Sequence, residues 1–586
     1  MEETKVCQNC KGEFKIDASD FEFYKKMSVP PPTWCPECRM MRRMCFWNEH
    51  GFFKKVEKRT GKEIFSMYPP EAPVEIYERE FWWSDSWDPL SYGHDIDWNL
   101  PFLKQIGELM RVVPWAARSQ MRCVNSDYSN NCADMKNCYL CFNADQCEDS
   151  MYGIGLMQIK NCVDIFRATE CELVYDSYAM FKSYQCFYVS QGVNNRNVWL
   201  SYDCEDCSDC FGSANLRHKQ YNIFNQQYSK EEYFAKIKEM NLGSFSALEE
   251  QKRRFEKHLL SFPRKHMQGS RNVNVTGDYF RLSKNVKKSF AGVNCENIAY
   301  SQSIIMGAKE SYDYTNWGNN VEFTYETQSV GEDVQRVKFS YECFGGASDI
   351  EYSIYCPGSN NLFGCVGMRN KQYCILNKQY SKEEYQALVP KIKQFMIDVP
   401  YVDKLGRVYK YGEFFPLDFS PYAVNETAVM DFMEMDKEKA QKYGLVWREA
   451  NPREYKTTIL AKDLPDHIRD ATDRVFTEVI ACASCEKGYR IIPNELHFLR
   501  RFNLPLPRIC FNCRHEARVK LRNHPVWYSG KCQCAGTAST SGAYMNVAKH
   551  SHDKDQPCGN EFETTFLPNY PGIVYCDSCW QAEMYS

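Results

Sequence analysis

The strongest constraint on this chain is a cysteine pattern that occurs once near each end. Both copies read Cys-x2-Cys-x24-Cys-x2-Cys, and their members are Cys7, Cys10, Cys35 and Cys38, and Cys482, Cys485, Cys510 and Cys513. Two Cys-x-x-Cys pairs at this separation can place four thiolates tetrahedrally around one Zn²⁺. The pattern therefore predicts one zinc-ribbon module used twice, at residues 1–50 and 476–525.

A second cysteine group follows the C-terminal module. It contains Cys532, Cys534, Cys558, Cys576 and Cys579, of which four would close another tetrahedral site. We assign the ligands Cys534, Cys558, Cys576 and Cys579, and the choice between Cys532 and Cys534 stays open at this point. Residues 526–586 are therefore predicted to form a second zinc ribbon, which raises the expected content to about three zinc ions per chain.

The N-terminal half carries a copy of this second ribbon that lacks its thiolates. At an offset of 498 residues, Trp82 matches Trp580. At the positions of the last three cysteines stand Thr60, Glu78 and Phe81. Because this kind of site needs thiolates, we expect residues 51–100 to form a degenerate, metal-free ribbon. The tryptophans expected to hold it by packing are Trp82, Trp83 and Trp87.

Between the ribbons the cysteines recur with a fixed period. Spacings of 24 residues join Cys138, Cys162, Cys186 and Cys210, and parallel ladders include Cys123, Cys147 and Cys171, and Cys132 and Cys204. A period of this size is typical of a solenoid, in which each coil stacks on the next. Strand-like pieces such as NCYLCF and NCVDIF alternate with Asn, Asp and Ser turns, which predicts a β-solenoid with coils of about 24 residues. Buried thiols usually pack as small apolar groups, and metal binding is an alternative for one cluster, Cys204, Cys207 and Cys210.

The predicted solenoid is itself duplicated. Residues 211–233 recur at 363–385, and both copies contain SKEE, a helix capping box. The capping pairs are Ser229 with Glu232 and Ser381 with Glu384. Two solenoid blocks are therefore predicted, at residues 120–228 and 272–380, followed by a helical cap and linker (229–271) and by a helical cap and connector (381–475). In the second block the expected inward residues are Val286, Ile298, Val321, Val337, Ile350 and Leu362.

The predicted fold class is thus mainly β with some α: zinc ribbons at both termini flank a duplicated β-solenoid with helical caps. The chain has 30 cysteines, and the paired CxxC spacing among them indicates metal ligation rather than a disulfide framework. The start MEETKVCQNC lacks a signal-peptide profile, and no apolar run reaches the roughly 18 residues of a membrane span. We therefore expect a cytoplasmic protein without membrane partners.

Several segments together carry a resemblance to a known family. They are CQNCKGEF, FYKKMSVPPPTWCPECRMMRR, FWWSDSWDPLSYG, the NCYLCF-type ladder, NKQYSKEEY, GEFFPLDFSPYAVNET and VYCDSCWQAE. In this order they resemble uncharacterised zinc-ribbon and cysteine-repeat proteins of small-genome bacterial lineages, over essentially the whole chain. The resemblance implies no established activity. It implies metal-competent ribbons in the first pair, from which Thr60, Glu78 and Phe81 depart.

The sequence favours a binding protein over an enzyme. The motifs GxxxxGK[ST], HExxH and GxSxG do not occur in it, and four-cysteine zinc sites leave no position for a substrate. We therefore expect a non-enzymatic, zinc-stabilised interaction scaffold that binds protein partners through the solenoid surface and the ribbons. One such partner is a second copy of the chain, in a homodimer formed through the ribbons or through the solenoid.

Two other functions stay open. The first is RNA or DNA binding through basic ribbon faces, for which the candidates are Arg39, Arg42, Arg43, Arg514, Arg518, Lys520 and Arg522. The net charge of −4 excludes a uniformly basic binder but not such a local patch. The second is a carbohydrate-active β-solenoid enzyme, which rests on fold analogy alone.

Overall fold

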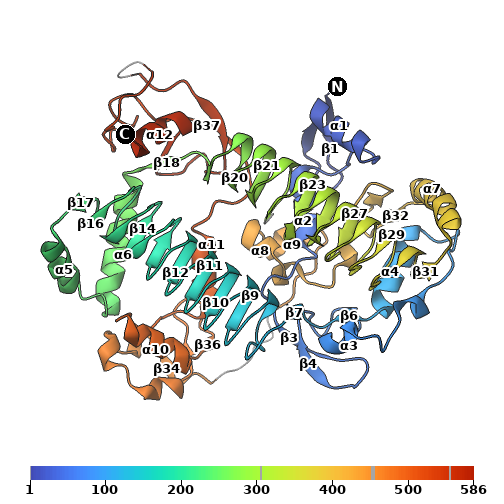
Figure 1. The fold of residues 1–586 in the computed structure, drawn as a ribbon, viewed down its shortest axis with the longest axis horizontal. Helices are drawn as coiled ribbons and strands as arrows, with labels where there is room; N and C mark the ends of the chain where they lie inside the picture. The colour runs from blue at the N-terminus through green and yellow to red at the C-terminus, as the bar shows by residue number, and fades with distance from the viewer. Residues whose placement is uncertain (1, 304–305, 450–455, 553–555, 586) are drawn as a thin grey trace. The chain divides into compact units, whose positions relative to one another are not determined.

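The computed structural model describes residues 2–303, 306–449, 456–552 and 556–585 (Figure 1). As predicted, it is mainly β with some α, and parallel strands dominate. The chain divides into two compact units built from distant segments. Unit 1 comprises residues 1–119, 267–449 and 524–527, and unit 2 comprises residues 120–266, 450–523 and 528–586. Each unit combines one long sheet with modules from one end of the chain.

The sheet of unit 2 contains eleven strands in chain order. They are β7 (Gln120–Met121), β8 (Asn130–Ala133), β9 (Tyr139–Asp145), β10 (Met151–Met157), β11 (Val163–Thr169), β12 (Tyr175–Phe181), β13 (Phe187–Ser190), β14 (Arg196–Tyr202), β15 (Ser208–Phe211), β16 (Gln220–Ile223) and β17 (Gln226–Gln227). All neighbours pair in parallel except β16 and β17, which form an antiparallel hairpin at the edge.

The sheet of unit 1 is built in the same way. Its strands are β19 (Gly269–Ser270), β20 (Val273–Arg281), β21 (Lys284–Val293), β22 (Glu296–Ala299), β23 (Lys309–Thr315), β25 (Glu322–Gln328), β27 (Gln335–Tyr341), β28 (Ser348–Glu351), β29 (Asn360–Phe363), β30 (Gln372–Ile375) and β31 (Lys378–Gln379). The short strands β24 (Gly318–Asn319) and β26 (Gly331–Glu332) pair alongside it. The last pair, β30 and β31, is again antiparallel.

The repeat in these sheets is 12 residues, half the coil length predicted from the cysteines. Met151 pairs with Val163, 12 residues on, and separate parallel bridges such as Val124 to Lys136 keep the same interval. In unit 1 some repeats take 13 residues, as in the pairing of Glu296 with Lys309. The predicted 24-residue coil was wrong because cysteine occupies only alternate repeats of the interior column. In sequence order this column reads Cys138, Ser150, Cys162, Val174, Cys186 and Val198, all buried.

A three-residue rhythm builds each repeat. Inward positions fall at every third residue, as at Cys204, Cys207 and Cys210, and the residue before an inward one often has positive φ. Asp206 and Asp209 have φ values of 53° and 49°. Asn and Asp tolerate this left-handed conformation better than most residues. This explains the recurrent Asn-Cys and Asp-Cys pairs of the sequence.

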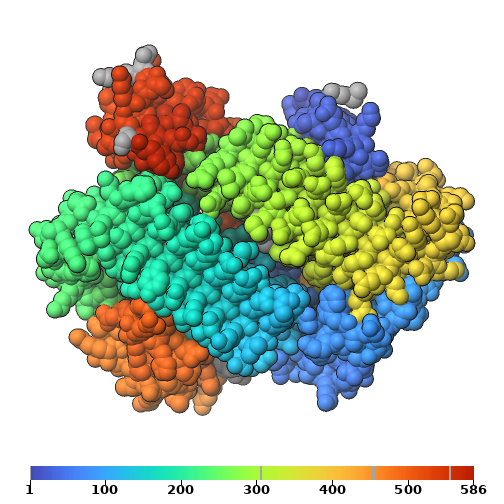
Figure 2. Space-filling view, in the orientation of Figure 1, coloured from blue at the N-terminus to red at the C-terminus, as the bar shows by residue number. Residues whose placement is uncertain are grey.

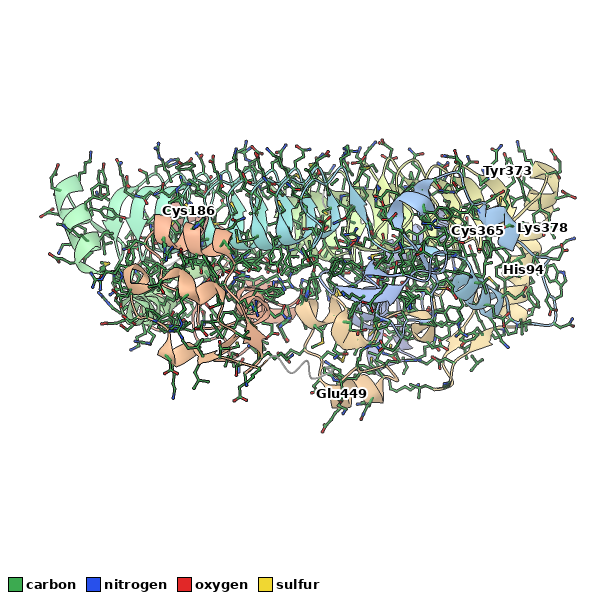
Figure 3. The ribbon with its side chains drawn as sticks, turned by 90° about the horizontal axis from the view of Figure 1, so that it is seen from below. His94, Cys186, Cys365, Tyr373, Lys378 and Glu449 are labelled. Carbon is green, nitrogen blue, oxygen red and sulfur yellow. The ribbon has the colours of Figure 1, made fainter. Side chains whose placement is uncertain are left out.

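The cysteines of the ladder pack inside the stack, as expected. Their thiols donate to backbone carbonyls, for example from Cys162 Sγ to the oxygens of Lys160 at 3.3 Å and Cys171 at 3.6 Å. Figure 3 labels Cys186 and Cys365, each fully buried within its own unit. The six aliphatic residues predicted to point inward in unit 1 are at most 2% exposed. Their prediction is confirmed.

Helices close both sheets where the capping boxes predict them. The helices α5 (Lys230–Glu239) and α7 (Lys382–Asp398) begin after Ser229 and Ser381, and both capping boxes are formed. After α5, the chain continues into α6 (Phe245–Leu260). None of the helices in the described ranges combines the length and hydropathy that a bilayer crossing needs.

The remaining elements belong to the terminal modules and connectors. The helices are α1 (Ala18–Lys26), α2 (Pro36–Met44), α3 (Arg79–Trp83), α4 (Phe102–Val112), α8 (Val429–Phe432), α9 (Lys437–Lys442), α10 (Pro493–Arg501), α11 (Phe511–Val519) and α12 (Asp577–Met584). The strands are β1 (Glu3–Val6), β2 (Glu13–Ile16), β3 (Phe53–Val56), β4 (Glu63–Ser66), β5 (Ile76–Tyr77), β6 (Trp115–Ala116), β18 (Pro263–Lys265), β32 (Tyr401–Val402), β33 (Val408–Tyr409), β34 (Ile459–Leu460), β35 (Ile480–Ala481), β36 (Gly488–Tyr489), β37 (Tyr528–Lys531), β38 (Glu561–Thr564) and β39 (Ile573–Tyr575).

Glu342, which follows β27, should make the stability of unit 1 depend on pH. Burial raises the pKa of its carboxyl from 4.5 to about 8, against a lowering contribution from Ser329. The folded state therefore keeps a proton that the unfolded chain releases. The stabilising contribution is complete below pH 4.5 and is lost as the pH rises to about 8.

We expect Glu342→Gln to be more stable than the native chain at pH 8.5 by about 4–5 kcal/mol, and to differ little at pH 4.5. Urea unfolding at the two pH values measures the difference in unfolding free energy between the two proteins. Hydrogen exchange of the β27 amides serves as a local probe of unit 1. An equal gap between the two proteins at both pH values would contradict the prediction.

Candidate metal centres

The two repeated cysteine patterns each form a compact group. In unit 1 the Sγ atoms of Cys7, Cys10, Cys35 and Cys38 all lie within 4.8 Å of one another, and in unit 2 those of Cys482, Cys485, Cys510 and Cys513 do the same. In each group the first two cysteines lie in the turn of a short hairpin. The last two lie at the start of a helix, α2 in unit 1 and α11 in unit 2, and the N-caps of these helices are Cys35 and Cys510. Both predicted ligand sets are brought together.

The donor chemistry of these groups fits a cationic metal. In unit 2 the backbone amide of Cys510 donates to Cys482 Sγ at 3.2 Å. Burial opposes ionisation of this thiol, but amide donors from Cys510, Cys485 and Ser484 outweigh it and lower the pKa of Cys482 to about 7. Thiolate is the form that binds metal, so these residues could hold a tetrahedral ion such as Zn²⁺.

The third four-thiol group contains Cys532 in place of Cys534, the choice that the sequence left open. Four buried thiols lie within 4.8 Å of one another, namely those of Cys532, Cys558, Cys576 and Cys579. The amide of Cys576 donates to Cys532 Sγ at 3.2 Å, which repeats the contact between Cys510 and Cys482. Cys532 directly follows β37 and pairs through its amide with the Asn560 carbonyl beside Cys558, at 3.0 Å. Pairing of β37 with β38 therefore places this cysteine, and not Cys534, in the site.

In residues 51–100, the segment predicted to be a degenerate ribbon, a carboxylate connects the three positions that stand in place of cysteines. The buried Glu57 carboxylate accepts from the amide of Thr60 at 2.9 Å and from its hydroxyl, and from the amide of Glu78 at 3.5 Å. Arg59 forms an ion pair with Glu57 at 3.4 Å and lies 4.4 Å over the ring of Phe81. Hydrogen bonds and a cation–π contact thus link the three substituted positions. Neither Glu57 nor Arg59 stood out in the sequence, because neither belongs to a cysteine motif or to the repeat.

Packing of the tryptophans in this ribbon follows the prediction in part. Trp82 is 1% exposed and donates to the Pro114 carbonyl at 2.8 Å, and Trp87 donates to the Trp82 carbonyl at 2.8 Å. Trp83, in contrast, is 42% exposed. Of these three tryptophans, Trp82 and Trp87 are therefore the ones well placed to stabilise this segment by packing.

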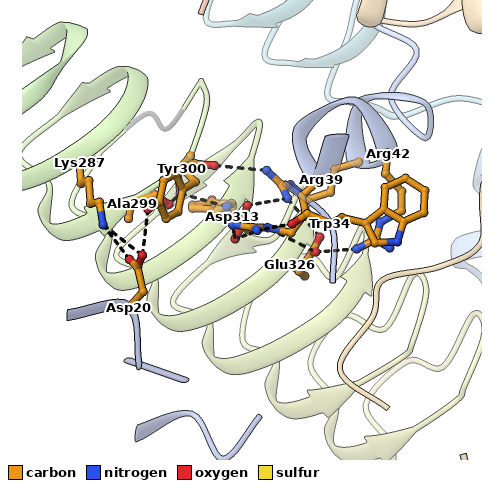
Figure 4. Close-up of polar contacts among 12 residues, drawn as sticks. Asp20, Trp34, Arg39, Arg42, Lys287, Ala299, Tyr300, Asp313 and Glu326 are labelled. Atoms are coloured by element: carbon orange, nitrogen blue, oxygen red, sulfur yellow. Dashed lines mark hydrogen bonds and ion pairs between the residues drawn. The ribbon is translucent and has the colours of Figure 1, made fainter. Parts of the chain in front are cut away.

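In unit 1 the arginines of α2 enter a buried charge network on the sheet (Figure 4). Asp313 on β23 accepts from Arg39 at 2.9 Å and from Arg43 at 3.0 Å. Glu326 on β25 accepts from Arg42 and Arg43, and Glu413 accepts from Arg42. The three arginine side chains are at most 1% exposed. The helix that contains Cys38 and begins after Cys35 is thereby fastened to two neighbouring strands.

Unit 2 repeats this network with α11. Arg514 and Arg518 both contact Asp164 on β11, at 2.8 and 3.1 Å. Arg518 also contacts Asp176 on β12 at 2.8 Å, and Arg514 contacts Glu495 at 3.0 Å. The arginines occupy the same positions in the cysteine module as Arg39 and Arg43. The same docking mode has therefore been built twice.

These networks are incompatible with the predicted nucleic-acid surface. Arg39, Arg42, Arg43, Arg514 and Arg518 are buried against carboxylates. Arg522 is 4% exposed and lies 5.1 Å over the ring of Phe166. Among the seven candidates Lys520 alone is exposed. A phosphate cannot reach the six arginines without breaking the docking of the modules, because their guanidinium groups already lie in protein.

Residues 51–100 and 526–586 also pack on their sheets in the same way. In unit 1 Arg369 lies 5.4 Å over the ring of Trp82 and donates to the Ser84 carbonyl at 2.9 Å. In unit 2 Arg217, which precedes Arg369 by the 152-residue repeat offset, lies 5.4 Å over the ring of Trp580. In unit 1, therefore, the N-terminal modules pack on the second repeat block. In unit 2 the C-terminal modules pack on the first repeat block.

The sequence named one more metal candidate, the cluster of Cys204, Cys207 and Cys210. All three are at most 2% exposed, and their thiols donate to the carbonyls of Tyr202, Glu205 and Ser208 at 3.3–3.6 Å. They follow the pattern of the other ladder cysteines, so packing explains them. No protein-family model and no curated protein matches the sequence, so its function has to be argued from these sites and surfaces.

Proposed function

We propose that the protein is a non-enzymatic scaffold, stabilised by zinc, that binds a protein partner on the uncovered face of its sheets. In this proposal each 12-residue stack is a β-solenoid and each four-cysteine group is a zinc ribbon with a closed coordination sphere. Tetrahedral four-thiolate sites are typically structural because no position remains for substrate. The three groups predict about three such ions per chain, which fasten the modules to the sheets rather than react.

The observation that carries the proposal is a polar ladder along unit 2. Successive repeats present one outward side chain above another, at the roughly 4.8 Å spacing of neighbouring strands. Ion pairs between repeats include Arg122 to Asp134, Lys136 to Glu148, Lys160 to Glu148 and Lys182 to Glu170. These side chains are between 34% and 61% exposed. Figure 2 shows the repeats of unit 2, teal to cyan, at the surface of the view, and Figure 3 shows side chains projecting outward along the upper edge of these repeats.

The charge pattern of this ladder favours protein over nucleic acid. Acidic and basic groups alternate and neutralise one another, whereas binding to phosphates needs a surplus of positive charge. Near β14 and β15 the face is hollowed by about 370 Å³, and the lining is polar: Gln185, Arg196, Asn197, Ser208, Asp209 and Gln220. Such a surface suits the polar and charged side chains of a folded partner.

Site-specific photo-crosslinking in the native cell tests the proposal. A crosslinking amino acid at Lys160 or Lys182 lies on the ladder, and the control position is Lys531, which is 80% exposed on β37. We expect a defined, nuclease-resistant protein adduct from the ladder positions and little from the control. A second copy of the chain in the adduct would identify the partner as a homodimer. Adducts with nucleic acid, or equal yields at the control, would refute the proposal.

A further inference from the structure

The third four-cysteine group has a neighbour that the ribbon pattern does not explain. Cys534, His550, His552 and Cys579 place one ligand atom each within 4.8 Å of one another. Cys534 is fully buried, and it is not needed to complete the group of Cys532, Cys558 and Cys576. Two cysteines and two histidines are a usual ligand set for tetrahedral Zn²⁺.

A buried carboxylate orients this neighbouring group. Glu583 on α12 is 2.8 Å from His550 Nε2 and also accepts from the Val547 amide at 2.9 Å and the Tyr544 hydroxyl at 2.9 Å. Its side chain is fully buried. When Nε2 of His550 donates to this carboxylate, Nδ1 keeps the lone pair that a metal needs. A carboxylate that holds the far nitrogen of a histidine is the common outer contact of metal-bound imidazole.

The other ligands are placed by the same elements. Asn546 donates to Cys534 Sγ at 3.2 Å, a contact that suits a thiolate acceptor. His552 Nε2 lies 3.6 Å from Cys579 Sγ. Cys579 and Glu583 both belong to α12, one turn apart, so a single helix orients ligands of both groups.

We propose that this group holds a second zinc ion, bound by Cys534, His550, His552 and the thiolate of Cys579, and that Cys579 bridges it to the ion of the Cys532 group. The charge balance supports a shared thiolate. One Zn²⁺ with four thiolates carries a charge of −2, whereas two Zn²⁺ with five thiolates and two neutral imidazoles carry −1. The second ion therefore lowers the charge buried in this module, and burying charge is costly.

Native mass spectrometry of the intact chain, purified with zinc, tests the second site. The proposed second site rests on the proposal that the three four-cysteine groups bind zinc. Those groups alone predict three ions per chain, and the second site raises the prediction to four. The double variant His550→Ala/His552→Ala should hold three ions, and the control His497→Ala, altered at an exposed residue of α10, should hold four. The three ions kept by the double variant show that the ribbons stay folded.

Two results would overturn the second site. The first is three ions in both the native chain and the double variant, which would leave the ribbon zincs intact. The second is three ions in the native chain and two in the variant, which would mean one mixed site. Cadmium-113 NMR of the cadmium-loaded chain gives an independent readout. A Cys2His2 resonance, separate from those of four-thiolate sites, should be present in the native chain and absent in the double variant.

Discussion

Replacing Cys510 by serine should release one metal ion and unfold the module that contains α10 and α11. Cys510 is the N-cap of α11, its thiol is one of four ligand atoms, and its amide stabilises the Cys482 thiolate. A structural zinc ion contributes on the order of 10 kcal/mol to the folding of its module. The folding free energy lost with the ion should therefore be larger than the packing of α10 and α11 can supply.

The effect should spread into the sheet of unit 2. Arg514 and Arg518 on α11 neutralise Asp164, which is fully buried on β11. Without the helix, β11 loses both these ion pairs and the packing of α11 that covers it. Hydrogen exchange should therefore accelerate in α11 and in β11, and metal analysis should show one ion fewer.

The matched control is Cys162→Ser, a buried cysteine of the ladder. Its thiol donates to carbonyls and belongs to none of the metal groups among the described residues. This variant should keep the full metal content. If Cys510→Ser also kept every ion and its exchange pattern, the structural role of the site would be wrong.

Replacing Asp313 by alanine should destabilise unit 1 by about 3–5 kcal/mol. Asp313 accepts from both Arg39 and Arg43, and all three side chains are at most 1% exposed. Removing one partner of a buried ion pair leaves the other charge uncompensated, which costs far more than the pair gains. Glu326 can compensate only in part because it already serves Arg42 and Arg43.

Urea unfolding, with hydrogen exchange of α2 and β23 as local probes, measures this effect. The control is Asp349→Ala, which removes an ion pair with Arg336 on the outer face of the same sheet. Both partners of that pair are more than one third exposed, so its loss should shift the midpoint little. Equal shifts for the two variants would mean that the network on α2 does not anchor the module.

Local patterns were the predictable part of this protein. The two four-cysteine groups that begin at Cys7 and at Cys482 could be predicted, because a Cys-x-x-Cys turn directs both of its thiols to one point, whatever surrounds it. The capping boxes at Ser229 and Ser381 were predictable for the same reason, since each involves residues three apart. The choice of Cys532 over Cys534 was not, because pairing of β37 with β38 decides it.

The repeat length shows how a correct pattern can lead to a wrong interval. The 24-residue spacing of Cys138, Cys162 and Cys186 is real, but Ser150 and Val174 occupy the same interior column between them. Serine, valine and cysteine are of similar size, so the stack accepts any of them. The better signal was the Asn or Asp before each inward residue, which marks the three-residue rhythm through its positive φ.

The sequence by itself determined the two repeated four-cysteine groups, the residues that point into the sheets and the helices that cap them, because each depends on residues a few positions or one repeat apart. Only the tertiary structure decided that α2 docks on the second repeat block and α11 on the first. The arginines of α2 find Asp313 across 270–274 residues, and Arg518 finds Asp164 across 354. Attraction between opposite charges depends on distance in space and leaves no periodic trace in the sequence. The arginines that suggested a nucleic-acid surface therefore proved to be the contacts that hold each four-cysteine module to its sheet.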